Sequence, residues 1–175
     1  EALAELTVRY FTGHGPATIK DFAWWSSLTV TDIRRGLEMV AGQLQRERIE
    51  DVEYWSGGSE VPPDSERVHL IHTFDELIVG YSETKHLIDL EGVAAGSETG
   101  IYAPSIVVDG QVAGVWKRSM EGHNLRLDLT HYKRLADETS AALGSATERL
   151  GRFFGHANPL VAMQYARDDG RPRGP

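Results

Sequence analysis

The stretch PATIKDFAWWSSLTVTDIRRGLEMVAGQLQRERIEDVEYWS, residues 16–56, decides the fold of the N-terminal part of the chain. Pro16 suits the first turn of a helix, and the apolar spacing after it predicts a short helix over 17–27. A turn through Ser27 and Leu28 leads to Thr29, a predicted N-cap with an acid three residues later. The following helix has an apolar stripe formed by Ile33, Leu37 and Val40.

The flanks of this stretch complete a recognisable module. On the N-terminal side, residues 2–11 place four apolar side chains on one face and predict a helix: Leu3, Leu6, Tyr10 and Phe11. On the C-terminal side, shorter periods over 44–55 predict a two-stranded hairpin that turns near Glu50 and Asp51. Two helices joined by a tight turn are a helix-turn-helix. With the first helix and the hairpin, residues 1–58 are predicted to form a winged helix-turn-helix domain.

Residues 56–67, SGGSEVPPDSER, mark the best internal boundary, and β-like patterns follow them. Two apolar runs occupy 68–81, and Asp109-Gly110 within 105–117 predicts a hairpin with a type I′ turn. A further strand is indicated by the alternation of Leu125, Leu127 and Leu129.

A long amphipathic helix is predicted next, with its inward positions at Leu135, Thr139, Ala142, Leu143, Ala146, Leu150 and Phe153. The β-rich domain is expected to span 68–160 and a tail 161–175. The predicted class is therefore α+β: a winged helix-turn-helix, a small antiparallel β domain and a C-terminal helix.

Composition narrows the class of protein. The formal net charge is −8, which argues against strong nonspecific DNA binding by the chain as a whole, because phosphate neutralisation drives such binding. Without Cys, disulfides, thiolate catalysis and Cys-ligated zinc are excluded. No apolar run reaches the roughly 20 residues of a membrane helix and no signal peptide opens the chain, so we expect a cytoplasmic protein without a membrane partner. The sequence also lacks an initiator Met, and we interpret it as a fragment.

Three separated segments carry a resemblance to a known family: RYFTGHGPATIKDFAWWSSLTVTDIRRGLE (9–38), HTFDELIVGY (72–81) and TGIYAPSIVVDGQVAGVWKR (99–118). In this order they resemble the bacterial winged-helix DNA-binding domain family that includes the DNA glycosylases unhooking interstrand crosslinks. The resemblance covers most of residues 5–130.

This resemblance implies a fold of serial winged helices followed by a β-barrel-like domain, of which the chain would be the C-terminal half. The implied partners are double-stranded DNA and the missing N-terminal domain of the same protein. Apart from the resemblance, no cofactor and no metal are expected, because the sequence has neither a Gly-rich phosphate loop nor a zinc-binding pattern. Glycosylase members carry a catalytic Gln-x-Gln or Gln-x-Asp motif in their N-terminal half. Gln43-Leu44-Gln45 has these letters but ends the third predicted helix, so no catalytic residue is assigned in this chain.

Seven cations are candidates for DNA contact. Arg34 and Arg35 lie near the start of the predicted recognition helix, where Arg reads guanine edges and phosphates; the alternative is a solvated face paired with acids such as Glu38. The remaining candidates are Lys20, Arg46, Arg48, Lys117 and Arg118. Arg46 and Arg48 would contact phosphate from the hairpin or simply protect a charged edge strand.

Other side chains also admit two interpretations. At least one of Trp24 and Trp25 is expected in the core, with an exposed indole free to stack on a base or pack against another domain. Asp75 and Glu76, inside an apolar run, suggest either a general base or a turn bonded to backbone amides.

We interpret the histidines as structural, including the His69-x-x-His72 pair, which lacks the helical zinc pattern, and His86 and His131.

Three functions remain open at this stage. The first is a DNA-binding fragment of a DNA-repair glycosylase whose chemistry lies upstream. The second is a protein-interaction scaffold whose acidic surface keeps nucleic acid away. The third is a transcriptional regulator, which predicts a ligand pocket within 68–130 and a dimer.

Overall fold

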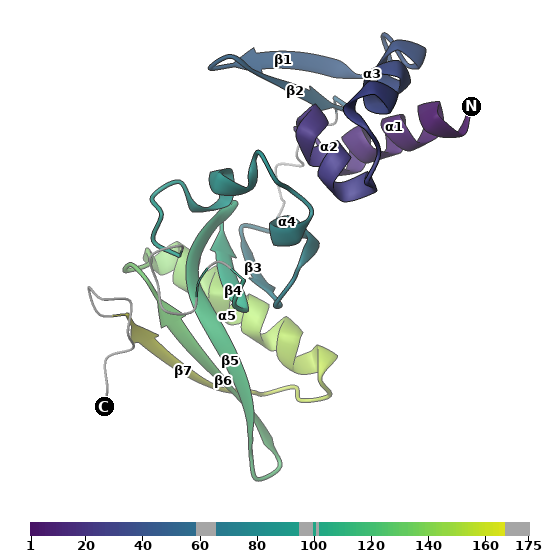
Figure 1. The fold of residues 1–175 in the computed structure, drawn as a ribbon. Coiled ribbons are helices and arrows are strands. Elements are labelled where there is room, and N and C mark those ends of the chain that lie inside the picture. The colour runs from purple at the N-terminus through teal and green to yellow at the C-terminus, as the bar shows by residue number, and fades with distance from the viewer. Residues whose placement is uncertain (59–65, 95–99, 101, 167–175) are drawn as a thin grey trace. The chain divides into compact units, whose positions relative to one another are not determined.

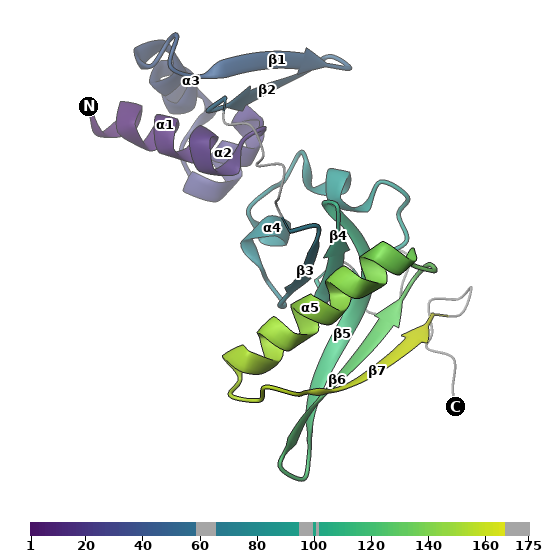
Figure 2. The same cartoon turned by 180° about the vertical axis from the view of Figure 1, so that it is seen from behind.

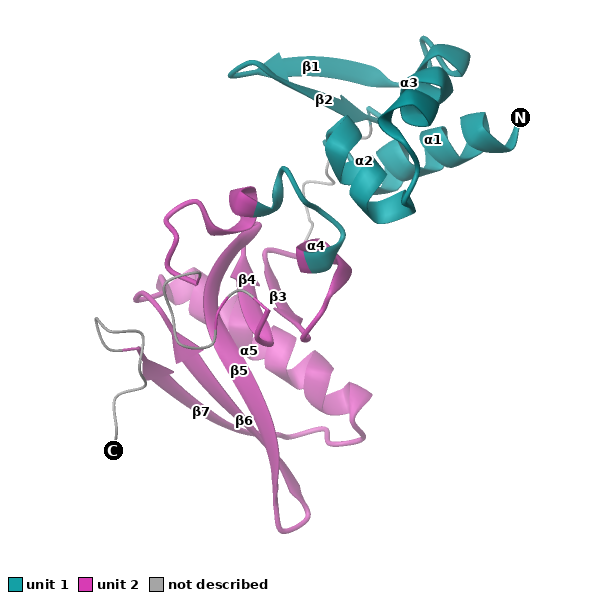
Figure 3. Ribbon diagram, in the orientation of Figure 1, with its two compact units in different colours: residues 1–63, 79–85 teal, residues 64–78, 86–175 magenta. Residues whose placement is uncertain are grey.

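The computed structural model describes residues 1–58, 66–94, 100 and 102–166. The chain divides into two compact units (Figure 3). One, here called the helical unit, comprises residues 1–63 and 79–85, and the other, the sheet unit, comprises 64–78 and 86–175. No helix among the described residues is long and apolar enough to cross a membrane.

The helical unit contains three helices and a β-hairpin, as the sequence predicts (Figure 1). The elements are α1 (Ala2–His14), α2 (Ile19–Ser26), α3 (Val30–Met39), β1 (Gln45–Ile49) and β2 (Val52–Ser56). The antiparallel register pairs Ile49 with Val52, and Glu50 and Asp51 between them both have positive φ, at 46° and 66°. Positive φ at both central residues is the signature of a type I′ turn, so the predicted hairpin and its turn are confirmed.

Side-chain caps explain where α2 and α3 begin. Thr29 accepts a hydrogen bond from the Asp32 amide, which confirms the predicted cap of α3. Thr18 and Asp21 form a complete capping box at α2. The helices bury one apolar cluster: Tyr10, Phe11, Ala17, Phe22, Ile33 and Leu37.

Gly36 allows α1 and α3 to approach each other closely. A Cβ added at this residue would lie 2.3 Å from the Thr7 hydroxyl oxygen, and Thr7 is itself fully buried. The missing side chain therefore sets the spacing of the two helices and so the position of the exposed face of α3.

The sheet unit is built on five strands in the order β3-β4-β5-β6-β7, with α5 across one face (Figures 1 and 2). The bounds are β3 (Val68–Ile71), α4 (Glu76–Val79), the 3-10 helix η1 (Lys85–Asp89), β4 (Ser105–Val108), β5 (Gln111–Glu121), β6 (Asn124–His131), α5 (Asp137–Phe153) and β7 (Leu160–Tyr165). The predicted hairpin is confirmed, because Val108 pairs with Gln111 around Asp109 and Gly110, which have φ of 49° and 77°.

Three features of this unit correct the sequence-based picture. The described strands form an open sheet with β3 and β7 at its edges, and not a barrel. The sheet is not wholly antiparallel, since β7 runs parallel to β6. Parallel neighbours need a crossover connection, and α5 provides it. β7 also occupies residues that the prediction assigned to a tail.

The predicted inward stripe of α5 is correct at Leu143 and Ala146, which pack on Leu125, Leu127 and Leu129 of β6. It is wrong at Phe153, whose side chain is 81% exposed. Leu150 and Phe154, four residues apart, both pack on this core. Phe153 is turned about 100° from Phe154 around the helix axis and so points to solvent.

Candidate nucleic-acid interface

Arg34 and Arg35 are the candidates whose exposure and freedom from ion pairs fit contact with a ligand. Both are exposed on α3, and neither makes an ion pair within the described residues. The residues around them, Ile33, Gly36 and Leu37, are buried and fix the helix against the core. The exposed face of α3 thus presents two guanidinium groups from a rigid helix.

The hairpin cations are arranged differently, because each contacts an acid of the same hairpin. Arg46 and Arg48 alternate along β1, and their registered partners on β2 are Trp55 and Glu53. The Arg46 guanidinium lies 5.7 Å from the Trp55 ring centroid and 3.4 Å from a Glu53 carboxylate oxygen. Arg48 contacts Asp51 in the turn at 2.9 Å. The positive charges of both guanidinium groups are therefore partly offset by acids of the hairpin itself.

Lys20, the remaining candidate of the helical unit, is paired with Glu83. Glu83 belongs to residues Val79–Lys85, here called the strap, which is part of the helical unit although it lies far along the chain. The strap is also held by the Trp24 indole N–H, which donates to the Val79 carbonyl at 2.8 Å, and by the Tyr81 hydroxyl, which donates to the His14 carbonyl at 2.9 Å. The hydrogen bond and charge of Glu83 raise the pKa of Lys20.

Asp21 is the buried carboxylate that anchors the strap to α2. Its Oδ1 accepts from the backbone amides of Ser82, Glu83 and Thr84 at 2.8, 2.8 and 3.2 Å. Its Oδ2 accepts from the amide and hydroxyl of Thr18 and from the Thr84 hydroxyl at 3.1, 2.9 and 3.0 Å. Burial alone would raise the pKa of Asp21, but the hydrogen bonds from Thr18, Ser82 and Thr84 outweigh it and lower that pKa. A carboxylate saturated with donors is a structural anchor rather than a proton acceptor.

Sequence reasoning missed Asp21 and the strap. Thr18-x-x-Asp21 has the capping-box spacing, which was the available signal. The buried carboxylate was sought instead at Asp75 and Glu76. Asp75 directly precedes α4 and accepts a hydrogen bond from the Leu77 amide at 3.0 Å, which supports the turn interpretation, and Glu76 is exposed.

The expectation that Trp24 or Trp25 lies in the core is wrong, because the two side chains are 58% and 39% exposed. The eight-residue α2 buries its Phe22 side, and both indoles lie at the margin of that contact. Trp24 serves the strap, with the Lys85 ammonium 5.8 Å from its ring centroid, and Trp25 contacts the Tyr10 ring at 5.2 Å.

Lys117 and Arg118 lie on β5 in the sheet unit, in the part of the β5–β6 hairpin that is exposed. Successive strand residues face opposite sides, so the two cations point to different faces of the sheet. Arg118 lies over the Phe154 ring at 4.3 Å from its centroid, on the face covered by α5. Neither cation makes an ion pair with the described part of the chain.

The histidines do not assemble a metal site. No group of three or more His, Asp or Glu among the described residues is placed to hold a metal ion. His69 Nε2 lies 2.8 Å from the Glu66 carbonyl oxygen, and His72 packs edge-on against Trp116. His131 is buried on β6 with no hydrogen-bond partner for either ring nitrogen among the described residues, and burial lowers its pKa.

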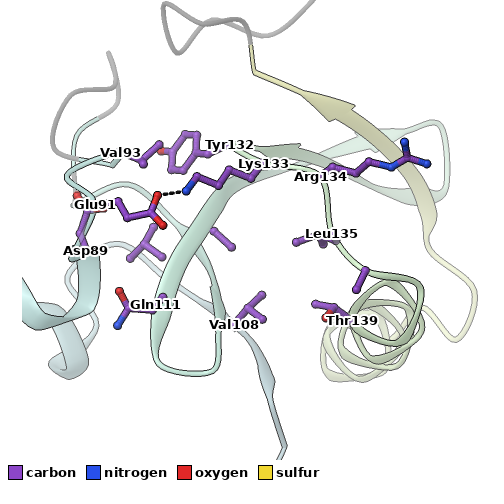
Figure 4. Close-up of a pocket in the computed structure, with 13 residues that line it drawn as sticks. Asp89, Glu91, Val93, Val108, Gln111, Tyr132, Lys133, Arg134, Leu135 and Thr139 are labelled. Atoms are coloured by element: carbon purple, nitrogen blue, oxygen red, sulfur yellow. Dashed lines mark ion pairs between the residues drawn. The ribbon is translucent and has the colours of Figure 1, made fainter.

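A cavity of about 310 Å³ lies in the sheet unit (Figure 4). An ion pair between Lys133 and Glu91 crosses one side of it, while Val108, Leu135 and Thr139 lie on the others. Its lining runs from Asp89 to Thr139 and so overlaps only in part with the 68–130 range in which the regulator interpretation expects a pocket.

Comparison with known proteins defines the class. The family model for AlkZ-like DNA glycosylases matches residues 1–153, and the chain therefore belongs to the AlkZ-like DNA glycosylase family. The fold is similar to that of the Streptomyces sahachiroi DNA glycosylase AlkZ, with a TM-score of 0.69 at 21% sequence identity. The similarity covers 93% of this chain and 45% of that chain, so the present chain spans less than half the length of that protein. A comparison with curated proteins finds no match.

Proposed function

We propose that this chain is the C-terminal, DNA-positioning part of a DNA-repair glycosylase, and that the residues that excise the base lie upstream of it. In this proposal α1 to β2 act as a winged helix, with α3 as the recognition helix on duplex DNA. Family membership supports a glycosylase, and the capped, well-packed α3 supports the role of its exposed face.

The observation that carries the proposal is the pair Arg34 and Arg35, which are exposed and make no ion pair within the described residues. Arginine without an acidic partner has a positive charge that no neighbouring acid offsets, and its fork of donors is available for phosphate oxygens or guanine edges. Lys117 and Arg118 supply a second cationic position on β5, in the sheet unit.

A salt titration of duplex affinity tests the DNA contact. Each phosphate contact contributes about 0.9 to the slope of log affinity against log salt, so R34Q/R35Q is expected to lower the slope by about 1.8. The control R9Q/R134Q removes two exposed arginines elsewhere and the same charge. Equal slopes for all three proteins would contradict the role of α3, as would a wild-type chain that binds no duplex at low salt.

The placement of the chemistry has its own test. On a duplex that carries an interstrand crosslink, the full-length protein is expected to release the modified base, whereas the present chain alone leaves the DNA intact. Base release by the chain alone would show that the excising residues lie within it.

The scaffold function stays as the second candidate, because one observation favours it. Lys20, Arg46 and Arg48 are each paired with an acid, which weakens the attraction of this side of the helical unit for phosphate. Failure of the wild-type chain to bind duplex would leave this function as the better one.

A further inference from the structure

The three acids that pair with Lys20, Arg46 and Arg48 come from three different places in the helical unit. Glu83 belongs to the strap, Glu53 to β2, and Asp51 to the hairpin turn. Arg46 and Arg48 are each paired with an acid of their own hairpin, whereas the contact between Lys20 and Glu83 joins residues that lie 63 positions apart in the sequence.

These pairs line two hollows beside α3. One has a volume of about 470 Å³ and is lined by Lys20, Arg48 and all three acids, and the other, of about 420 Å³, is lined by Arg46 and Glu53. Ile19, Arg34 and Glu53 line both, so the hollows adjoin and form one groove along α3 and the hairpin. A DNA backbone seated on α3 would meet the paired cations in this groove.

Glu83 is held in place by its own backbone. Its amide donates to Asp21 Oδ1 at 2.8 Å, and the amides on both sides of it donate to the same oxygen. Asp21 follows Lys20 directly in the sequence. The buried anchor therefore fixes the position of Glu83 next to the ammonium group that Glu83 neutralises.

The pairs are weak enough for DNA to displace. The exposed fractions of their side chains are 70% and 27% for Lys20 and Glu83, 62% and 41% for Arg46 and Glu53, and 69% and 93% for Arg48 and Asp51. Exposed ion pairs contribute about 0–1 kcal/mol, so they lower the attraction for any phosphate backbone without preventing contact when further interactions are made.

We propose that Asp51, Glu53 and Glu83 form an electrostatic mask over the groove beside α3, which selects against nonspecific duplex DNA. The mask rests on the proposed DNA-positioning function and regulates that same surface. Nonspecific binding to undamaged duplex depends mainly on phosphate contacts, and these compete poorly with three acids already in place. A substrate held by additional contacts displaces the acids and frees Lys20, Arg46 and Arg48 for its backbone.

The test compares D51N/E53Q/E83Q with the wild-type chain on a fluorescein-labelled, undamaged, mixed-sequence duplex, by fluorescence anisotropy across salt concentrations. Three freed cations raise the salt slope by about 2.7, at about 0.9 for each. A fourfold dilution of salt then strengthens binding about 40-fold more for the variant than for the wild type. Far-UV circular dichroism verifies that the variant is folded.

A matched control separates the mask from net charge. E5Q/E91Q/E138Q also removes three acids from ion pairs, with Arg9, Lys133 and Arg67, so both triple variants change the net charge from −8 to −5. The mask predicts that the wild type binds the duplex at low salt and that only D51N/E53Q/E83Q gains affinity and slope relative to it.

Each remaining outcome overturns the mask. If both triple variants gain equally, net charge explains the effect. If neither gains while wild-type binding depends on Arg34 and Arg35, the mask fails and the proposed function stands. If no protein binds the duplex, both proposals fail.

Discussion

Replacing Asp21 by Ala is the most informative perturbation of the helical unit. The change removes the acceptor of six hydrogen bonds, three on each carboxylate oxygen. Water can reach the exposed Ser82, but Thr18 and Thr84 are only 2% and 5% exposed. Their two backbone N–H groups would be buried without an acceptor, because only their hydroxyls can rotate to new partners.

The magnitude follows from those two groups. A buried donor left without its partner costs about 1–3 kcal/mol, so two cost about 2–6 kcal/mol. We expect Asp21→Ala to lower the free energy of unfolding of the helical unit by about 3–5 kcal/mol. Asp21→Asn keeps the oxygen that can face the strap amides but turns an NH₂ group toward Thr18, and we expect it to cost less than Ala.

Urea unfolding followed by tryptophan emission measures the change. Trp24, Trp25 and Trp55 lie in the helical unit and Trp116 in the sheet unit, so emission reports mainly on the unit that is perturbed. The control is Asp32→Asn at the corresponding position of α3, where the carboxylate makes one hydrogen bond, at 2.6 Å to an exposed Thr29 hydroxyl. A loss for Asp21→Ala below about 1 kcal/mol, or equal to that of the control, would refute the anchoring role.

The lowered pKa of Asp21 also predicts the direction in which the stability of the helical unit changes with pH. Because its folded-state pKa is lowered, the unfolded chain binds the proton more readily, and the stabilisation is complete above the ordinary pKa of about 3.8. It is lost as the pH falls through the lowered value. The wild-type helical unit should therefore lose more stability below pH of about 4 than Asp21→Asn does.

Three further predictions concern packing, titration and the turn of the β4–β5 hairpin. Gly36→Ala is expected to destabilise the helical unit by about 1–3 kcal/mol despite the better helix propensity of Ala, and Thr7→Ala in the same chain should recover part of the loss in urea unfolding. Burial lowers the pKa of His131, so the sheet unit should lose stability as the pH falls below about 6.5, and His131→Leu should remove this loss in urea midpoints measured against pH. Gly110→Ala, at a φ of 77°, should cost about 1 kcal/mol in thermal unfolding, whereas Gly144→Ala in α5 should not destabilise the protein.

Elements with local signals were predictable from the sequence. The Thr29 cap, the hairpin turn at Glu50 and Asp51, and the Asp109-Gly110 turn depend on residues within a few positions of one another. Elements defined by distant partners were not. β7 was assigned to a tail because its pairing with β6 is made after a crossover through α5. Closure into a barrel was expected from family resemblance, and the described strands do not close.

The same distinction separates the candidate cations. Once the hairpin turns at Glu50 and Asp51, the antiparallel register places Glu53 opposite Arg48 and diagonal to Arg46, so an acid beside both arginines follows from the sequence. The pairing of Lys20 with Glu83 does not, since 63 positions separate them and it depends on the long-range contacts of the strap, above all the hydrogen bonds to Asp21.

Net charge alone therefore does not describe the electrostatics of this surface, because it shows neither the unpaired cations nor the paired ones. A value of −8 suggests general repulsion of DNA, yet Arg34 and Arg35 remain free of ion pairs within the described residues, while three other cations are neutralised individually. Under the proposed function, binding depends on which cations keep an acid within contact distance when DNA approaches. In this fold that is determined by the hairpin register for Arg46 and Arg48, and by one buried carboxylate for Lys20.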